Sequence, residues 1–544
     1  MECGCLEAKR QSFLKGAAIL AAASIIVKII GAIYKLPLFQ DGVLGVEGTG
    51  DFQVTYSVYT LILTISTAGI PAALSRLVSS AAAGGDTKLV RRYFSVALPA
   101  FTLIGVAAMV VMFVFADEFA RLMNNSMAAQ GIRVLAPAVL FACIISVYRG
   151  YAQGFENMIP TAVSQIVEVI CKAVFGIALA LWLVNMAYES HIVSAGAIVG
   201  VTIGLGLCIP LLVWYKRRMD RKLHVSSDAE GLPKRMDVFG KIMKVSIPIT
   251  ISASFMAIMV VIDNSIVLGR LQSALLYSEN EARALFGIYS RGLAIYNLPP
   301  SLVVPVSVSI IPAIAAAIAR KREGEAGVIM QSSVKLVNLL AMPASAGMMV
   351  LATPIMTALY NDSQQLTAQI LIILGASAFF VCLQYVTTAI LQANGHERVA
   401  LMTFPVGAAL KIALGYILAG NPNFGIIASP IGTLACFIVI SALNIVFIKA
   451  RVKERPKFSG VFIKPLICSM VMAGAAYIVY ELLSRLASGI IGTGRLAVTL
   501  CLGAAIVAGV AVYGILIIKT RTITMEDMKL VPKGERLAKL LRIK

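Results

Sequence analysis

Basic side chains inside long apolar segments are the groups in this sequence best placed to do chemistry. The bases at such depth are Lys28, Lys35, Lys172, Arg291 and Lys411. The acids at comparable depth are Glu168 and Asp263. An isolated charge in hydrocarbon costs several kcal/mol, so such residues normally face a partner or a water-filled cavity. Because the bases outnumber the acids, the pattern favours an anionic ligand over a cationic drug, and it predicts that the bases bind this ligand.

Spacing assigns different roles to some of these charges. Glu168 and Lys172 are four residues apart, which places them on one helix face and predicts a structural ion pair. Asp263 lies in the middle of its apolar segment, and we name it as the candidate site for a coupling ion; a hydrogen-bonded structural aspartate is an equal alternative.

The composition of the chain indicates the class of protein whose elements must position these groups. The chain has 544 residues, of which 59% are hydrophobic and 14% charged, and a soluble protein usually carries about 25% charged residues. An ordinary soluble enzyme is therefore excluded. The three histidines lie in expected loops and the cysteines lack zinc spacing, so we expect no metal or other cofactor.

Fourteen apolar segments are long enough to cross a hydrocarbon core of about 30 Å. They cover residues 13–38, 52–79, 93–115, 128–149, 160–184, 192–215, 242–269, 285–318, 328–352, 366–391, 402–419, 425–448, 461–483 and 496–518. With this map, 32 Lys and Arg residues fall on the side that holds both termini and five on the other side. Since cytoplasmic loops are enriched in Lys and Arg, both termini are predicted to be cytoplasmic in a bacterial plasma membrane.

An internal repeat relates the two halves of the chain. Phe141, Cys143, Gln153 and Lys172 recur 239 residues later as Phe380, Cys382, Gln392 and Lys411. The repeat predicts an all-α membrane protein with two six-helix lobes around a central cavity, plus two appended helices. The expected divisions are an N-lobe at 1–225, a cytoplasmic linker at 226–241, a C-lobe at 242–450, appended spans at 451–520 and a basic cytoplasmic tail at 521–544.

Proline is concentrated in the eighth segment, at Pro299, Pro300 and Pro305. Broken membrane helices usually occur where protein or a cavity satisfies the freed backbone groups. The segment is therefore either a moving, cavity-lining element or a static kink.

Two stretches carry a family resemblance: residues 148–162, which include Arg149-Gly150-Tyr151, and residues 289–300, which include Arg291-Gly292 and Asn297. With the six-plus-six repeat, they resemble the polysaccharide-transporter branch of the MOP exporter superfamily, in its SpoVB/YtgP group, which is similar to MurJ-type lipid II flippases. The resemblance implies a MATE-like, two-lobe flippase that moves undecaprenyl-pyrophosphate-linked glycans, such as lipid II, from the inner to the outer leaflet. It places Lys28 and Arg291 at basic positions of the family. We assign substrate binding to Lys28, Lys35, Arg291, Lys411 and Asn297.

Two alternatives remain: MATE-like ion-coupled multidrug efflux, and a membrane glycan polymerase. A polymerase is disfavoured because the outer loops do not exceed about 16 residues on this map. The chain also lacks a phosphate-binding Gly-rich Lys-Ser/Thr loop, so we expect a transporter driven by Na⁺, H⁺ or the membrane potential. The expected partners are the lipid-linked glycan and membrane lipids, with no nucleic acid, and the chain is expected to be monomeric.

Overall fold

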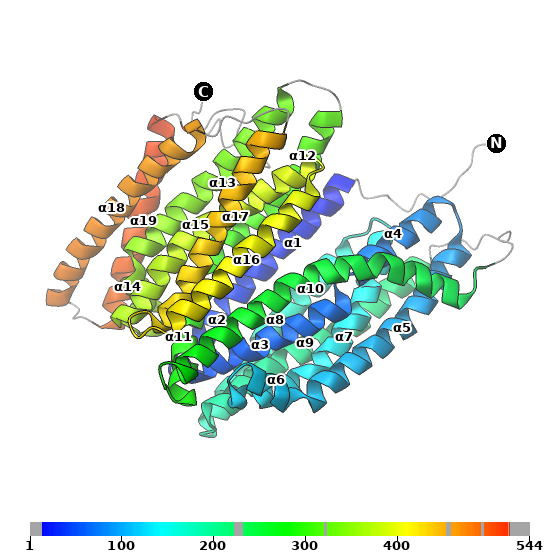
Figure 1. Ribbon diagram of the computed structural model, residues 1–544, viewed down its shortest axis with the longest axis horizontal. Coiled ribbons are helices and arrows are strands. Elements are labelled where there is room, and N and C mark those ends of the chain that lie inside the picture. The colour runs from blue at the N-terminus through cyan, green and yellow to red at the C-terminus, as the bar shows by residue number, and fades with distance from the viewer. Residues whose placement is uncertain are drawn as a thin grey trace. The chain divides into compact units, whose positions relative to one another are not determined.

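The computed structural model describes residues 13–221, 232–319, 324–452, 459–490, 494–520 and 522, and these residues contain helices but no strand (Figure 1). The chain divides into two compact units. The described part of unit 1 contains α1 (Phe13–Ile33), α2 (Lys35–Leu38), α3 (Gly45–Thr67), α4 (Ile70–Ala83), α5 (Thr87–Val114), α6 (Ala116–Leu122), η1 (Ser126–Ala128), α7 (Ala129–Gly154), α8 (Ile159–Asn185), α9 (Ser190–Asp220) and most of α10 (Arg235–Ser273).

Helix α11 (Glu279–Tyr296) belongs to unit 1 as far as Gly287 and to unit 2 from Ile288. The described part of unit 2 continues with α12 (Leu298–Ala319), α13 (Glu325–Val350), α14 (Ala352–Tyr360), α15 (Gln365–Ala393), α16 (Glu397–Ala419), η2 (Gly425–Ile427), α17 (Ala428–Arg451), α18 (Ser459–Ile490) and α19 (Arg495–Lys519).

Twelve helical segments in the described ranges are long and apolar enough to cross a membrane. They coincide with twelve of the fourteen predicted spans. The other two predicted spans, 13–38 and 285–318, correspond to α1 with α2 and to α11 with α12, which are not among the twelve. The prediction of a polytopic, all-α membrane protein is therefore confirmed, and the count of fourteen spans stays a prediction.

Helix α10 packs into unit 1, although the sequence placed it in the C-lobe. The Oγ1 atom of Thr250 accepts a hydrogen bond from the Gly69 backbone N–H at 3.1 Å, and Asn264 Nδ2 donates to Ser57 Oγ at 2.9 Å. A Cβ atom on Gly69 would lie 2.2 Å from the Ser246 carbonyl oxygen, so the two backbones are in direct contact. These contacts join most of α10 to unit 1, which ends at Gly287, beyond the predicted 226–241 linker.

The packing order repeats between the units. In unit 1, α5 and α9 pack on α7, α4 packs on α7, and α8 packs on α9. In unit 2, α13 and α17 pack on α15, α12 packs on α15, and α16 packs on α17. This equivalence confirms the repeat that the offset of 239 residues predicted.

The two C-terminal helices lie side by side in unit 2 (Figure 1). Helix α18 packs on α13 and α19 packs on α14. The Arg495 guanidinium donates to the carbonyl oxygens of Ala358 and Leu359 at 3.0 and 2.8 Å, which ties α19 to the end of α14. The predicted basic tail at 521–544 lies, except for residue 522, outside the described residues.

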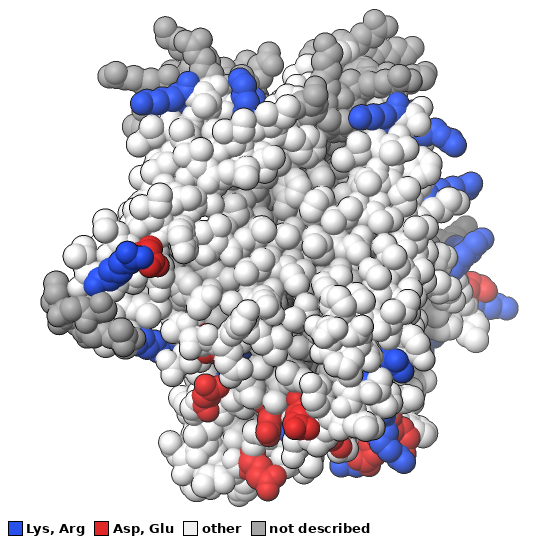
Figure 2. Space-filling model, turned by 60° about the vertical axis from the view of Figure 1, so that its left-hand side comes forward, with Lys and Arg blue, Asp and Glu red and all other residues white. Residues whose placement is uncertain are grey.

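Charged side chains lie mainly around the edges of the face shown in Figure 2, and the broad surface between them is uncharged. Large apolar side chains are exposed on many helices, including Leu103, Leu482 and Val507, which are 60–70% exposed. An apolar surface of this extent is what a protein in contact with lipid presents.

Candidate functional site

Lys172 lies among tyrosines in unit 1. Its Nζ atom donates a hydrogen bond to the Tyr56 hydroxyl at 2.7 Å. The same atom lies 4.5 Å from the centroid of the Tyr56 ring and 5.0 Å from that of Tyr34. The side chain of Lys172 is half-buried. The ammonium is therefore held by a hydroxyl and two cation–π contacts.

An aromatic stripe on α3 builds one wall of this cluster. Phe52, Tyr56 and Tyr59 follow one another at helical spacing, and neighbouring ring centroids in this series lie 5.6 Å apart. Phe39 extends the series, with its ring centroid 5.5 Å from that of Phe52. These packed rings fix the Tyr56 hydroxyl, because a side chain locked between neighbours loses its other rotamers.

Glu168 pairs with Arg149 of α7 and not with Lys172, so the predicted structural pair is wrong. Arg149 Nη2 lies 2.9 Å from Glu168 Oε2, and Arg149 Nε donates to Ser164 Oγ at 2.9 Å. Helix spacing allowed the Glu168–Lys172 contact, but a guanidinium from the neighbouring helix offers charge and directed donors in one group.

Lys28 and Lys35 come from the first two helices. Lys28 is exposed on α1, which packs against α8. Lys35 begins α2, directly after Tyr34, and its Nζ atom lies 5.8 Å from the Phe39 ring centroid. The Lys172 ammonium therefore contacts the Tyr34 ring and the Lys35 ammonium contacts the Phe39 ring, whereas no contact joins Lys28 to these rings among the described residues.

The stretch that begins at Arg149 serves packing within unit 1. A Cβ atom on Gly150 would lie 2.9 Å from the Cα atom of Pro71, and one on Gly154 would lie 2.6 Å from Val78. Tyr151 donates to Asp220 Oδ1 at 2.7 Å. Small residues at these positions let α7 and α4 approach closely, as in other membrane helix pairs.

Arg291 lies on the unit 2 part of α11. It is 1% exposed, and its guanidinium carbon lies 5.3 Å from the Tyr360 ring centroid. Asn297 lies between α11 and α12, so the predicted span 285–318, which contains the prolines, is not one continuous helix. Asn297 is exposed, and its Nδ2 atom donates to the Leu293 carbonyl at 2.7 Å. Arg291 is therefore enclosed in this conformation, and Asn297 is at the surface.

Lys172 of α8 and Lys411 of α16 lie on helices that pack in the same way, α8 on α9 and α16 on α17. A Cβ atom on Gly200 of α9 would lie 2.8 Å from the Lys172 carbonyl oxygen, and one on Gly432 of α17 would lie 3.2 Å from that of Lys411. Both lysines are half-buried.

Asp263 lies on α10 and is 3% exposed, which places it in unit 1 and not in the predicted C-lobe.

An ion pair that the sequence analysis missed joins α11 to α3. Arg283 Nε and Nη2 donate to the two oxygens of Asp51 at 2.8 and 2.6 Å, and both side chains are less than 5% exposed. Asn125 Nδ2 also donates to Asp51, at 2.9 Å, and Arg283 Nη1 donates to Asn280. The sequence placed Asp51 and Arg283 at predicted span ends, where charges are normally solvated.

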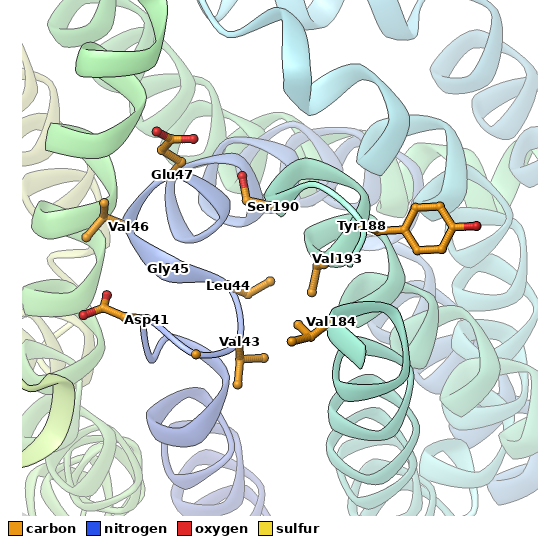
Figure 3. A pocket seen from close by; sticks show the side chains of 11 residues that line it. Asp41, Val43, Leu44, Gly45, Val46, Glu47, Val184, Tyr188, Ser190 and Val193 are labelled. Atoms are coloured by element: carbon orange, nitrogen blue, oxygen red, sulfur yellow. The ribbon is translucent and has the colours of Figure 1, made fainter. Parts of the chain in front are cut away.

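A pocket of about 400 Å³ lies at the predicted outer end of unit 1, between the α2–α3 loop and the α8–α9 loop (Figure 3). Its charged side chains are the carboxylates of Asp41 and Glu47, and no Lys or Arg lines it. The charge of this pocket is therefore opposite to that of the Lys172 cluster.

No group of three or more His, Cys, Asp or Glu side chains that could hold a metal ion occurs among the described residues.

The helical repeat and the basic residues within its spans define a membrane protein of the two-lobe exporter class. A family model described as "Polysaccharide biosynthesis protein" matches residues 13–318, and the chain belongs to this family, in the polysaccharide-transporter branch of the MOP superfamily. A second model, MatE, matches residues 286–417.

Three Bacillus subtilis proteins are similar to the chain. "Uncharacterized membrane protein YabM" is 28% identical over 98% of this chain and 97% of its own length. "Stage V sporulation protein B" is 24% identical over 96% of this chain and 98% of its own length. "Lipid II flippase MurJ" is 25% identical over 78% of this chain and 80% of its own length.

Solved structures with the same fold include a "Lipid II flippase MurJ, inward closed conformation", with a TM-score of 0.66 and 16% identity over 93% of this chain and 99% of that one. An inward-facing multidrug resistance MATE transporter has a TM-score of 0.61 and 16% identity over 80% of this chain and 97% of that one. At this identity, the similarity establishes the fold.

Proposed function

We propose that this protein is a flippase that translocates an undecaprenyl-pyrophosphate-linked glycan from the inner to the outer leaflet of the bacterial cell membrane. Alternating access by the two units would serve cell-wall or polysaccharide biogenesis, with both termini in the cytoplasm. Support comes from the family membership and from the relatives named for lipid II transport and for sporulation.

One observation carries this proposal: the excess of positive charge around Lys172 in unit 1. Lys28, Lys35 and Lys172 come from three helices of that unit. The carboxylate nearest in sequence to Lys172, that of Glu168, is neutralised by Arg149. The charge that remains around Lys172 is therefore positive and suits an anionic head group.

A pyrophosphate linker needs such an environment. It carries about two negative charges, which a low-dielectric passage stabilises only through cations and hydrogen-bond donors. Lysine supplies a compact charge on a flexible stem, so it can follow a moving phosphate. The polyprenyl tail can remain in the surrounding lipid, because it is as apolar as the lipid chains.

Substrate contacts in unit 2 are assigned to Arg291, Lys411 and Asn297 in this proposal. Lys411 is half-buried and equivalent to Lys172 by the repeat. Arg291 is buried against Tyr360, so substrate contact at this residue requires α11 or α14 to move during the transport cycle. Asp263, which is buried on α10, is the proposed position of a coupling ion, with Na⁺ or H⁺ as the candidates.

Multidrug efflux is the competing function, and the match of residues 286–417 to the MatE model is the observation in its favour. A pocket for cationic drugs is favoured by carboxylates whose charge no base neutralises. Glu168 is paired with Arg149 and Asp51 is paired with Arg283, so these two carboxylates are already neutralised.

Proteoliposomes test the proposed function. Fluorescent lipid II and a fluorescent undecaprenyl-pyrophosphate oligosaccharide unrelated to peptidoglycan are supplied separately, and appearance in the opposite leaflet is measured. Faster flipping of either lipid than in protein-free liposomes supports the proposal, and the ratio of the two rates identifies the glycan. Transport of a cationic dye without flipping of either lipid would establish efflux instead.

A further inference from the structure

The pocket at the predicted outer end of unit 1 adjoins a second pocket, which contains a histidine. Glu47 and Ser190 line both pockets (Figure 3), and the second has a volume of about 280 Å³. His191, in the first turn of α9, lines the second pocket, and its side chain is 13% exposed. Histidine is the side chain whose charge normally changes near neutral pH, so the charge in this pocket can follow the pH outside.

Charged groups at the ends of three helices face His191. The Oε2 atom of Glu189, which directly precedes α9, lies 3.3 Å from the imidazole Nδ1. Glu47 of α3 and Arg283 of α11 line the same pocket. The uncharged lining residues are Met127, Ser190 and Asn280. His191 therefore faces two carboxylates and one guanidinium.

The other charged groups near the start of α11 are directed elsewhere. Asp51 accepts hydrogen bonds from the Arg283 guanidinium at 2.8 and 2.6 Å. Glu279 accepts hydrogen bonds from the backbone N–H and the hydroxyl of Ser126. Glu281 accepts hydrogen bonds from the residue that precedes its own helix. Of the charged side chains of α11, Arg283 is therefore the one that lines the pocket.

The acids and the base around His191 belong to different parts of the fold. A Cβ atom on Gly48 would lie 3.0 Å from the Ser190 carbonyl oxygen, so α3 and α9 are in direct backbone contact beside the pocket. Glu47 and Glu189 lie next to this contact. Arg283 instead belongs to α11, which continues into unit 2. A movement of α11 can therefore remove the base and leave both acids in place.

Release of α11 from α3 would change the charge around His191 in one direction. The carboxylates of Glu47 and Glu189 would stay, and the positive charge of Arg283 would leave. Asp51 would lose its partner and keep its negative charge. A protonated imidazole is therefore more stable when α11 is released than when it is attached. By linkage, proton binding favours the released state.

We propose that His191 is a proton-binding site that controls the attachment of α11 to unit 1. At alkaline outer pH the imidazole is neutral, and the Asp51–Arg283 pair holds α11. At acidic outer pH the protonated imidazole pairs with Glu189 and repels Arg283, which shifts the population toward released α11. Because α11 continues into unit 2, this proton regulates the movement of one unit against the other. The site is separate from Asp263, and it acts whichever lipid is carried.

Distances between two spin labels test this proposal. The full chain in nanodiscs carries labels at Leu276→Cys, just before α11, and at Met186→Cys, just after α8; both positions are exposed in unit 1. Native cysteines that react with the label are replaced by serine. Double electron–electron resonance is recorded at about pH 5.5 and at about pH 8, on either side of the ordinary titration range of histidine. We expect one distance at the higher pH and, at the lower pH, a second and longer distance whose population rises severalfold.

Variants of His191 and its neighbour assign the response. His191→Gln should give the short distance at both pH values, because glutamine binds no proton. His191→Lys should give the longer distance at both, because its charge persists. Glu189→Gln should keep the response but lower the pH of its midpoint by roughly half a unit, since an exposed carboxylate contributes modestly to holding the proton. His396→Gln, which changes a histidine directly before α16, is the matched control and should respond like the wild type.

The same distance distribution at both pH values in the wild type would overturn the proposal. An undiminished response in His191→Gln would assign the proton to another group, and the short distance alone in His191→Lys would show that charge at this position does not release α11. If His191→Gln fails to fold, Glu189→Gln decides, because Glu189 is exposed and tolerates substitution. An unchanged midpoint in that variant would overturn the site. The proposed flippase function fails separately, in the flipping assay, and its failure would leave these distances unaffected.

Discussion

The guanidinium of Arg149 on α7 lies 2.9 Å from the carboxylate of Glu168 on α8, with 16% and 31% of the two side chains exposed. This pair crosses between two helices of unit 1 and holds the acid that is closest in sequence to Lys172. Because Arg149 neutralises Glu168, no carboxylate lies within ion-pair distance of Lys172 among the described residues.

Breaking this pair from one side should destabilise the protein. Arg149→Ala leaves Glu168 charged and partly buried. Loss of one partner of a fully buried pair costs roughly 3–5 kcal/mol, so we expect about 2 kcal/mol for this partly exposed one. The measurement is the Tm in detergent together with the yield of monodisperse protein. The double variant Arg149→Ala, Glu168→Ala should recover much of the loss, and a double variant no better than Arg149→Ala would contradict this role.

The Asp51–Arg283 pair should be more costly to break, because both side chains are nearly fully buried. Arg283→Ala is expected to lower stability by roughly 3–5 kcal/mol. Arg283→Lys should recover only part of this, since lysine cannot reproduce two parallel hydrogen bonds to a carboxylate. Thermal unfolding of the three proteins in one detergent checks both statements, and equal Tm values for the wild type and Arg283→Lys would show that the bidentate geometry is unimportant.

Glycine at the α3–α11 crossing should tolerate no side chain. A Cβ atom on Gly287 would lie 1.7 Å from the Val46 carbonyl oxygen, and one on Gly50 would lie 2.5 Å from that of Arg283. Gly287→Ala must push the helices apart and should cost about 3 kcal/mol or more. Gly503→Ala on α19 is the control, because nothing lies within 4 Å of its Cβ position. Similar unfolding temperatures for the two variants would contradict the close crossing.

Membrane orientation gives a prediction that can be checked in intact cells. Ser363 is exposed between α14 and α15, and Arg398 is exposed near the start of α16. The distribution of Lys and Arg places Ser363 outside and Arg398 inside. A membrane-impermeant maleimide should label Ser363→Cys and spare Arg398→Cys, with the wild type as background because most described native cysteines are buried. The opposite labelling pattern would invert the topology.

Periodicity and repetition predicted most of the fold, because each span needs only a local run of apolar residues. The equivalent packing of α7 and α15 follows from the repeated sequence around Cys143 and Cys382. The unit boundary did not follow, because α10 joins unit 1 through contacts at Gly69 and Ser57 that lie far away in sequence.

Charge partners were the least predictable part of the candidate site. Glu168 and Lys172 have the spacing of an ion pair, yet Arg149 from the neighbouring helix binds the carboxylate. Tyr56 was not named as a partner of Lys172, although the spacing of Phe52, Tyr56 and Tyr59 marks an aromatic face on α3. Local spacing identifies which residues share a face, whereas tertiary packing decides which neighbour reaches them.

The central claim is that basic residues carry an anionic lipid head group across the membrane. The most direct test measures flipping of a fluorescent undecaprenyl-diphosphate lipid in proteoliposomes by the wild type, Lys28→Arg and the double variant Lys28→Ala, Arg291→Ala, each normalised to folded protein. We predict that Lys28→Arg retains most of the wild-type rate and that the double variant falls to the rate of protein-free liposomes. A folded double variant that flips the lipid at the wild-type rate would contradict the claim.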